Sequence, residues 1–199
     1  LGRFKEGHQE VEVALHVGDS SETIDGVLRQ RFALGFVGVA RRDRHLTFEP
    51  FVRDRLVLIV PPDHPWAAAR RVSYKQLLNA PLILQQRGSG ATAVLQDALR
   101  EYGISFNELH IVAEVGLQES VKTAVRAGLG VAIISRLGVA EELARGVLVE
   151  VPVEGVELNR HLYAVYRRTT PLSNLARAFL DFAHRSAAEV LGSLEAEQR

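Results

Sequence analysis

The stretch VKTAVRAGLGVAIIS, at residues 121–135, decides the fold of this chain. Its first half repeats apolar residues with the period of an amphipathic helix, and Gly128 stands where that helix must end. Val131, Ile133 and Ile134 then form a β-branched run, which is typical of a covered strand. A helix that turns at once into a buried strand predicts an α/β fold and, by itself, indicates no ligand.

Strand and helix patterns alternate along the rest of the chain, as expected for a largely parallel sheet covered on both faces. The predicted strands lie at residues 11–17, 34–39, 56–60, 82–86, 110–115, 131–135, 147–153 and 161–168. The predicted helices lie at residues 1–6, 24–32, 92–102, 118–127, 137–145 and 174–191, with a short helix that begins at Ser73.

Three prolines within residues 61–65 interrupt this alternation, because proline removes an amide donor and biases its predecessor to extended geometry. We expect the chain to cross there between two lobes. The expected first lobe comprises residues 1–59 and 162–199, and the second comprises residues 60–161. Two crossings allow a hinge, and the cleft between two lobes is a usual place for a small molecule.

Composition argues against several classes of function. The chain has 199 residues and is 47% hydrophobic, which is enough for a sizeable core. Its 24 Lys and Arg residues balance 24 Asp and Glu residues, so we expect it not to bind DNA by itself. It contains no cysteine, which fits a reducing cytoplasm. It shows neither a secretory leader nor an apolar run of membrane-spanning length, so we expect no membrane contact.

Catalytic and cofactor motifs are weak. The seven histidines are scattered, without the spacing of a metal site. Gly88, Ser89 and Gly90 do not have the spacing of a nucleophile elbow. Gly128 and Gly130 lack the third glycine of a dinucleotide-binding fingerprint. We therefore expect neither an enzyme, nor a metal, nor a cofactor.

Three predicted strands are followed at once by turns rich in glycine and in hydroxyl or amide side chains. The turns read VGDSSE at residues 17–22, QRGSGAT at residues 86–92 and VGLQES at residues 115–120. In a parallel sheet such turns meet where helix amino termini present free N–H groups and a partial positive charge. We predict that they bind a small anion through Gly18, Asp19, Ser20, Gln86, Arg87, Gly88, Ser89, Gly90, Thr92, Gly116, Leu117 and Gln118.

The same residue types also allow a purely structural interpretation, because Ser, Asp and Thr before a helix commonly cap it. Arg87 is suited to a two-point contact with a carboxylate or another oxyanion. Asp19 argues against a purely anionic ligand, since its carboxylate would cap a helix or favour an amine or hydroxyl group. Both interpretations stay open at the level of the sequence.

Four segments resemble, in order and spacing, the effector-binding domain of LysR-type transcriptional regulators. They are HPW at residues 64–66, APLILQQRGSGATAVLQDALREYGI at residues 80–104, GLQES at residues 116–120 and VKTAVRAGLGVAIIS at residues 121–135. The resemblance covers the chain from residue 1 to about residue 183. It implies two Rossmann-like lobes joined by two crossovers, as in type II periplasmic binding proteins, with an inducer between them. It also implies a homodimer or homotetramer, and DNA binding by a separate upstream winged helix-turn-helix domain.

The resemblance further implies that the first strand of the first lobe precedes Leu1. The chain starts at that leucine and contains no methionine, so we expect a fragment of a longer protein. We predict a cytoplasmic, ligand-sensing regulatory domain, with a dimer surface beside residues 11–17 and 123–130. The alternative is a solute-binding protein of a transport system with the same fold, which a signal peptide upstream would favour.

Overall fold

The computed structural model describes residues 1–69, 71–86, 88–156 and 158–196. The helices are α1 (Gly2–Glu6), α2 (Ser20–Leu28), α3 (Tyr74–Asn79), α4 (Gly90–Glu101), α5 (Gln118–Arg126), α6 (Ala140–Ala144) and α7 (Asn174–Ala196), with 3-10 turns η1 (Phe106–Glu108) and η2 (Leu137–Val139). The strands are β1 (Gly35–Val37), β2 (Leu46–Val60), β3 (Leu82–Gln85), β4 (Ile111–Val115), β5 (Val131–Ser135), β6 (Val149–Val151) and β7 (Asn159–Arg167).

The strands form one mixed sheet in the order β1-β7-β2-β5-β3-β4, with β6 also paired to β2. β3 runs parallel to β4 and β5, whereas β2 is antiparallel to β5, β6 and β7. The prediction of a largely parallel sheet is therefore wrong. β6 and β7 follow one another along β2 and both run antiparallel to it, and β1 is in turn antiparallel to β7.

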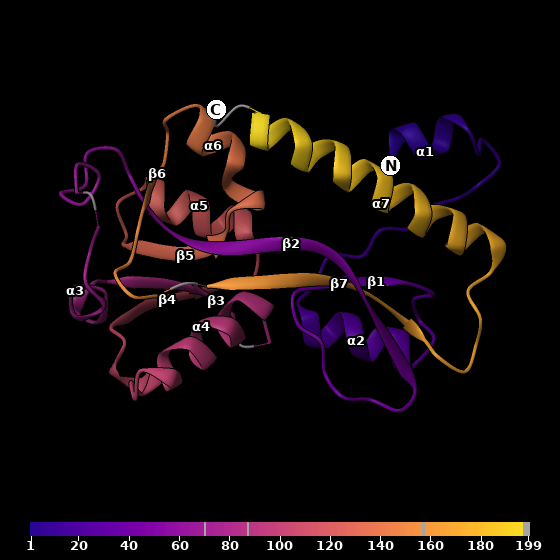
Figure 1. Cartoon of the computed structure of the whole chain (residues 1–199), viewed down its shortest axis with the longest axis horizontal. Coiled ribbons are helices and arrows are strands. Elements are labelled where there is room, and N and C mark those ends of the chain that lie inside the picture. Colours follow the sequence, from indigo (N-terminus) through magenta and orange to yellow (C-terminus); the bar gives the residue numbers. More distant parts are fainter. Residues whose placement is uncertain (70, 87, 157, 197–199) are drawn as a thin grey trace.

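Two long strands join the two halves of the molecule. β2 and β7 lie side by side across the middle, with α2 and α7 on opposite faces of one half and α4 and α5 on opposite faces of the other (Figure 1). β2 pairs with β7 over residues 46–55 and with β5 and β6 over residues 56–60. The chain thus passes between the halves within β2, before the proline-rich residues 61–65 where the sequence placed the crossing.

The core follows this division into halves. Val57 and Ile59 pack under α5 with Val121, in a cluster on one face of the sheet. Leu58 and Leu95 belong to the larger cluster on the opposite face, which α3 and α4 cover. A third cluster lies in the other half between α2, β1, β2 and β7, and contains Ile24, Val27, Val37, Leu46 and Val165.

The stretch at residues 121–135 folds as predicted. After α5, Gly128 has φ +76°, a left-handed conformation that stops the helix at little cost only for glycine. A Cβ atom on Gly130 would collide with the carbonyl oxygen of Pro81, so the second glycine lets the chain pass close to the start of β3. All five residues of β5 are buried.

The strand predicted at residues 11–17 is wrong. The segment pairs with no described strand, and Leu15 and Val17 are 71% and 66% exposed. Alternation of apolar residues gives a strand only where another backbone lies beside it to complete the hydrogen-bond ladder. Here none of the described strands does.

Candidate functional site

A cavity of about 230 Å³ lies where the two halves meet. Its walls come from both halves and include all three of the turns that the sequence singled out. They are formed by Gly18, Asp19, Ser20, Phe36, Val37, Gly38, Phe51, Gln85, Ser89, Gly90, Ala91, Gly116, Gln118, Arg160 and Leu162. A mixture of small, polar and aromatic residues is typical of a pocket for a small metabolite.

Seven of the twelve predicted contact residues line this cavity, namely Gly18, Asp19, Ser20, Ser89, Gly90, Gly116 and Gln118. Gln86, Gly88, Thr92 and Leu117 stand outside its walls. Arg87 lies outside the described residues, so the predicted two-point contact has no structural account.

The four residues outside the walls have other surroundings. The Thr92 hydroxyl donates to the carbonyl oxygen of Gln85, at 2.8 Å, and ties the start of α4 to the end of β3. Gln86 donates from Nε2 to Asp19 Oδ2, at 3.0 Å, and so links the two halves. Gly88 has φ +99° and lies against the same carboxylate. Leu117 is half exposed to solvent.

The polar residues of the turns also cap helices, as the structural interpretation held. Asp19 Oδ1 accepts from the backbone N–H of Glu22, at 2.8 Å, at the start of α2. Ser89 accepts from the N–H of Ala91, at 3.2 Å, at the start of α4. Both interpretations therefore apply to the same side chains, because a residue that caps a helix here also faces the cavity.

The two halves touch closely beside the cavity. A Cβ atom on Gly90 would lie only 2.8 Å from the Cα atom of Gly38, which belongs to the opposite half. The Ser20 hydroxyl accepts from the N–H of Gly38, at 3.1 Å, and holds that backbone in place. Glycine at both positions lets backbone meet backbone, so side-chain bulk at this contact would separate the halves.

The sequence analysis missed the one described cationic side chain on the cavity wall. Arg160 comes from β7 and its side chain is only 10% exposed. Its Nε donates to Asp54 Oδ2, at 2.8 Å, and Ser135 donates to Asp54 Oδ1, at 3.0 Å. Asp54 lies between Arg53 and Arg55, and Arg160 lies between Asn159 and His161, so neither residue stands out in the sequence as a buried polar position.

Aromatic residues form another part of the wall that the sequence did not indicate. The rings of Phe36 and Phe51 lie 4.6 Å apart between centroids and are tilted to each other. The register of β2 against β7 shifts between Pro50 and Val52, so Phe51 is the extra residue of a β-bulge. Bulges commonly redirect a side chain beside a functional site, and this one directs Phe51 to the cavity.

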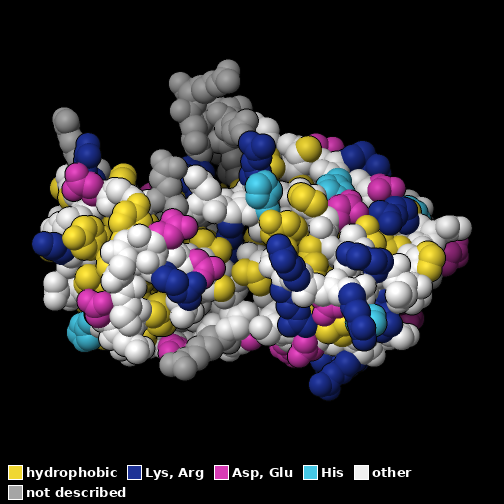
Figure 2. Space-filling model, turned by 60° about the horizontal axis from the view of Figure 1, so that its bottom comes forward, with side chains coloured by type: hydrophobic (Ala, Val, Ile, Leu, Met, Phe, Trp, Pro, Cys, Tyr) yellow, Lys and Arg dark blue, Asp and Glu magenta, His cyan; other side chains and the backbone are white. Residues whose placement is uncertain are grey.

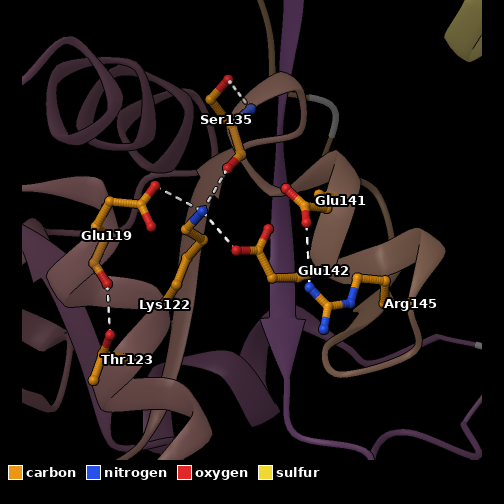
Figure 3. Close-up of polar contacts among 8 residues, drawn as sticks. Glu119, Lys122, Thr123, Ser135, Glu141, Glu142 and Arg145 are labelled. Carbon is orange, nitrogen blue, oxygen red and sulfur yellow. Dashed lines mark hydrogen bonds and ion pairs between the residues drawn. The ribbon is translucent and has the colours of Figure 1, made fainter.

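A second buried cation, Lys122, lies among acceptors from α5, α6 and the turn after β5 (Figure 3). Lys122 on α5 is 2.7 Å from both Glu119 Oε1 and Glu142 Oε1, and it donates to the carbonyl oxygen of Gly138, at 3.1 Å. Burial works to lower the pKa of Lys122, but the two glutamates raise it above its usual value. Burial works to raise the pKa of Glu142, but Lys122 lowers it below its usual range.

This cluster is continuous with the cavity. The N–H of Gly138 donates to the Ser135 hydroxyl, at 3.4 Å, and that hydroxyl is the one bonded to Asp54. The side-chain amide of Gln118 lies against Gly138, in the space that a Cβ atom on Gly138 would occupy. Polar contacts therefore lead from Arg160 through Ser135 to Lys122.

Lys and Arg side chains gather on the outer face of the half that holds α2 (Figure 2). Arg41, Arg42, Arg44 and Arg168 line a shallow depression there. Arg41 reaches Asp25 at 3.3 Å, with both side chains largely exposed, so we interpret these arginines as a solvated surface.

Among the described residues, no group of His, Asp and Glu side chains is arranged to hold a metal ion. None of the described helices combines the length and the apolar character needed to cross a membrane.

Known proteins resemble this chain in sequence and in fold. The profile of the LysR substrate binding domain matches residues 1–188. The HTH-type transcriptional activator CmpR of Synechocystis sp. is 29% identical over 192 residues, which cover 96% of this chain and 62% of CmpR. The chain spans about three fifths of the length of such curated relatives.

Solved structures show the same fold. The regulatory domain of CcmR from Synechocystis PCC6803, in complex with 2-PG, matches with a TM-score of 0.82 at 23% identity, over 94% of this chain and 88% of that one. The effector binding domain of QuiR, in complex with shikimate, matches with a TM-score of 0.79 at 18% identity, over the same shares of the two chains, 94% and 88%. The predicted two-lobed α/β fold is confirmed.

Proposed function

We propose an effector-sensing role for this chain, which belongs to the family of LysR substrate-binding domains. The effector is a small metabolite that carries an anionic group and binds between the two lobes. The observation that supports this most is the meeting of the three predicted turns with Arg160 in one cavity of about 230 Å³. The relatives CcmR and QuiR, in complex with 2-PG and shikimate, support an effector of this kind.

The role of the effector is to favour one arrangement of the lobes. A coupling free energy of about 1 to 3 kcal/mol would change the DNA affinity of an attached domain several-fold to a hundredfold. We propose that the attached DNA-binding domain is a winged helix-turn-helix and that the whole protein acts as a homodimer or homotetramer in the cytoplasm. The effector-sensing chain binds its effector without turnover. The name of CmpR, a transcriptional activator, is consistent with this role.

We place the first lobe at residues 1–59 and 162–199 and the second at residues 60–161, as the sequence suggested. The pairing of residues 56–60 with β5 and β6 favours a hinge slightly earlier, near residue 55. Limited proteolysis with and without effector would test that position, since residues at a hinge change their protection when the lobes close.

Thermal-shift screening against 2-PG, shikimate and other small carboxylates tests the proposed function. A ligand present at a hundred times its Kd stabilises the folded state by about 2.7 kcal/mol. Gly116→Leu fills the cavity and is expected to abolish the shift, whereas Gly2→Leu, at a position with open space around it, is expected to keep it. The proposal fails if no compound stabilises the unsubstituted chain, or if Gly116→Leu leaves the shift intact.

A further inference from the structure

We infer that Arg160 binds the oxyanion of the effector and that Phe36 and Phe51 contact an apolar body attached to it. This inference rests on the proposed function and names the ligand more closely. The ligand class is a monoanionic hydroxy acid with a compact ring or a branched apolar part. It follows from the donors of Arg160, the charges on the cavity wall and the size of the cavity.

The donors of Arg160 are mostly unused. A guanidinium has five N–H groups and stays protonated in proteins. Nε is bonded to Asp54, but no described residue accepts a hydrogen bond from the two terminal amino groups, although the side chain is nine-tenths buried. Arg160 lines the cavity, and an oxyanion bound there could accept from both terminal amino groups at once, in a charge-assisted two-point contact.

The residues around Arg160 leave its terminal amino groups free to bind a ligand. The Asp54 side chain is fully buried, is not part of the cavity wall, and accepts from Arg160 and Ser135 on different oxygens, so it holds the guanidinium through Nε alone. A Cβ atom on Gly38 would lie only 2.8 Å from Arg160 Nη1, so glycine leaves room for this amino group on the cavity wall.

The charges on the described part of the wall, on Arg160 and Asp19, favour a ligand with one negative group. Asp19 is the one carboxylate among the lining residues that the structure describes, and it accepts hydrogen bonds from Glu22 and Gln86. A second negative group near Asp19 would be repelled, whereas a hydroxyl group could donate to its carboxylate. The cavity therefore favours an oxyanion at Arg160 and a hydroxyl group at Asp19.

The size of the cavity sets how much of the ligand it can enclose. A volume of about 230 Å³ corresponds to the space of about eight water molecules, each occupying about 30 Å³ in the liquid. That space holds a guest of about ten non-hydrogen atoms. Phe36, Phe51 and Leu162 provide the apolar wall for its body.

The probe pair 3-hydroxybenzoate and 3-hydroxybenzamide tests the inference, because the two differ in the charged group alone. Titration calorimetry is expected to show binding of the acid, and at least about tenfold weaker binding of the amide, since a charge-assisted hydrogen bond contributes about 1.5 to 3 kcal/mol. Inorganic phosphate, which has no apolar body, is expected to bind more weakly than the acid. Equal affinity for acid and amide overturns the inference.

Variants locate the contact. Arg160→Gln is expected to weaken binding of the acid at least about tenfold, whereas Arg145→Gln, which removes an exposed partner of Glu141 outside this cavity, is expected to leave binding unchanged. Because Arg160→Gln leaves Asp54 without its cation, the double variant Asp54→Asn/Arg160→Gln serves as a second test. Circular dichroism checks that each variant folds.

The outcomes separate the inference from the proposed function. If a compound stabilises the unsubstituted chain but a folded Arg160 variant binds it equally well, the inference is overturned and the effector-sensing role stands. If neither the probes nor the carboxylate panel binds the unsubstituted chain, both are overturned.

Discussion

Two buried cations of this protein differ in how fully their donors are used. Lys122 has three N–H donors and three acceptors within 3.1 Å, from Glu119, Glu142 and Gly138. Arg160 has five donors, of which one is bonded to a described residue, Asp54. A saturated cation, whose N–H donors all have acceptors within the protein, stabilises the fold. An unsaturated cation beside a cavity still has N–H donors that can bind a ligand.

The largest effect is expected when the saturated cation is removed. Lys122→Met leaves Glu142 partly buried without its partner and should lower the free energy of unfolding by about 3 kcal/mol, as measured by urea denaturation. The matched control is Arg145→Met, which removes an exposed ion pair with Glu141 and should cost no more than about 0.5 kcal/mol. Equal losses in the two variants would contradict the contrast between a buried and an exposed pair.

A smaller effect is expected at the contact that closes the cavity. Gly90→Ala places a Cβ atom against the backbone of Gly38 and should destabilise the chain by about 1 to 3 kcal/mol, because neither backbone can move aside easily. The variant should also weaken ligand binding, as Arg160 would lose the closed cleft around it. Gly192→Ala, on α7 with open space around the new methyl group, is the control and should be neutral or slightly stabilising in the same melts.

The smallest effect concerns pH. The pKa of Glu142 is lowered in the folded state from its usual 4.5, so its carboxylate contributes stability above pH 4.5, and this contribution is lost as pH falls through the folded pKa. Glu142→Gln should therefore be less stable than the unsubstituted chain by about 1 kcal/mol at pH 7, and the difference should shrink in acid. Denaturation curves between pH 7 and pH 3 test this. A difference that stays constant over that range would show that the carboxylate charge is not responsible.

The sequence predicted the part of the site that depends on local signals. Glycine and hydroxyl residues at the ends of strands mark turns, and the turns around Asp19, Ser89 and Gln118 do line the cavity. Local patterns also predicted α5 and β5, because Gly128 marks the end of a helix whatever surrounds it.

The sequence did not predict the part that depends on strand pairing. Asp54 and Arg160 are 106 residues apart and meet only because β2 and β7 pair antiparallel, which strand-by-strand patterns did not reveal. The bulge at Phe51 is a property of that same register. The strand expected at residues 11–17 failed for the same reason, since its alternation specified a face but not a neighbour.

The bulge at Phe51 places its aromatic ring so that it borders two cavities. Besides the cleft, Phe51 and Leu162 border an apolar hollow of about 380 Å³ against α7, where the Phe51 ring also lies 5.1 Å from His184. His184 is bonded in turn to Glu49, at 3.1 Å. Phe51 thus borders both the cleft and the hollow against α7, so a rotation of its ring would change the shape of both spaces together.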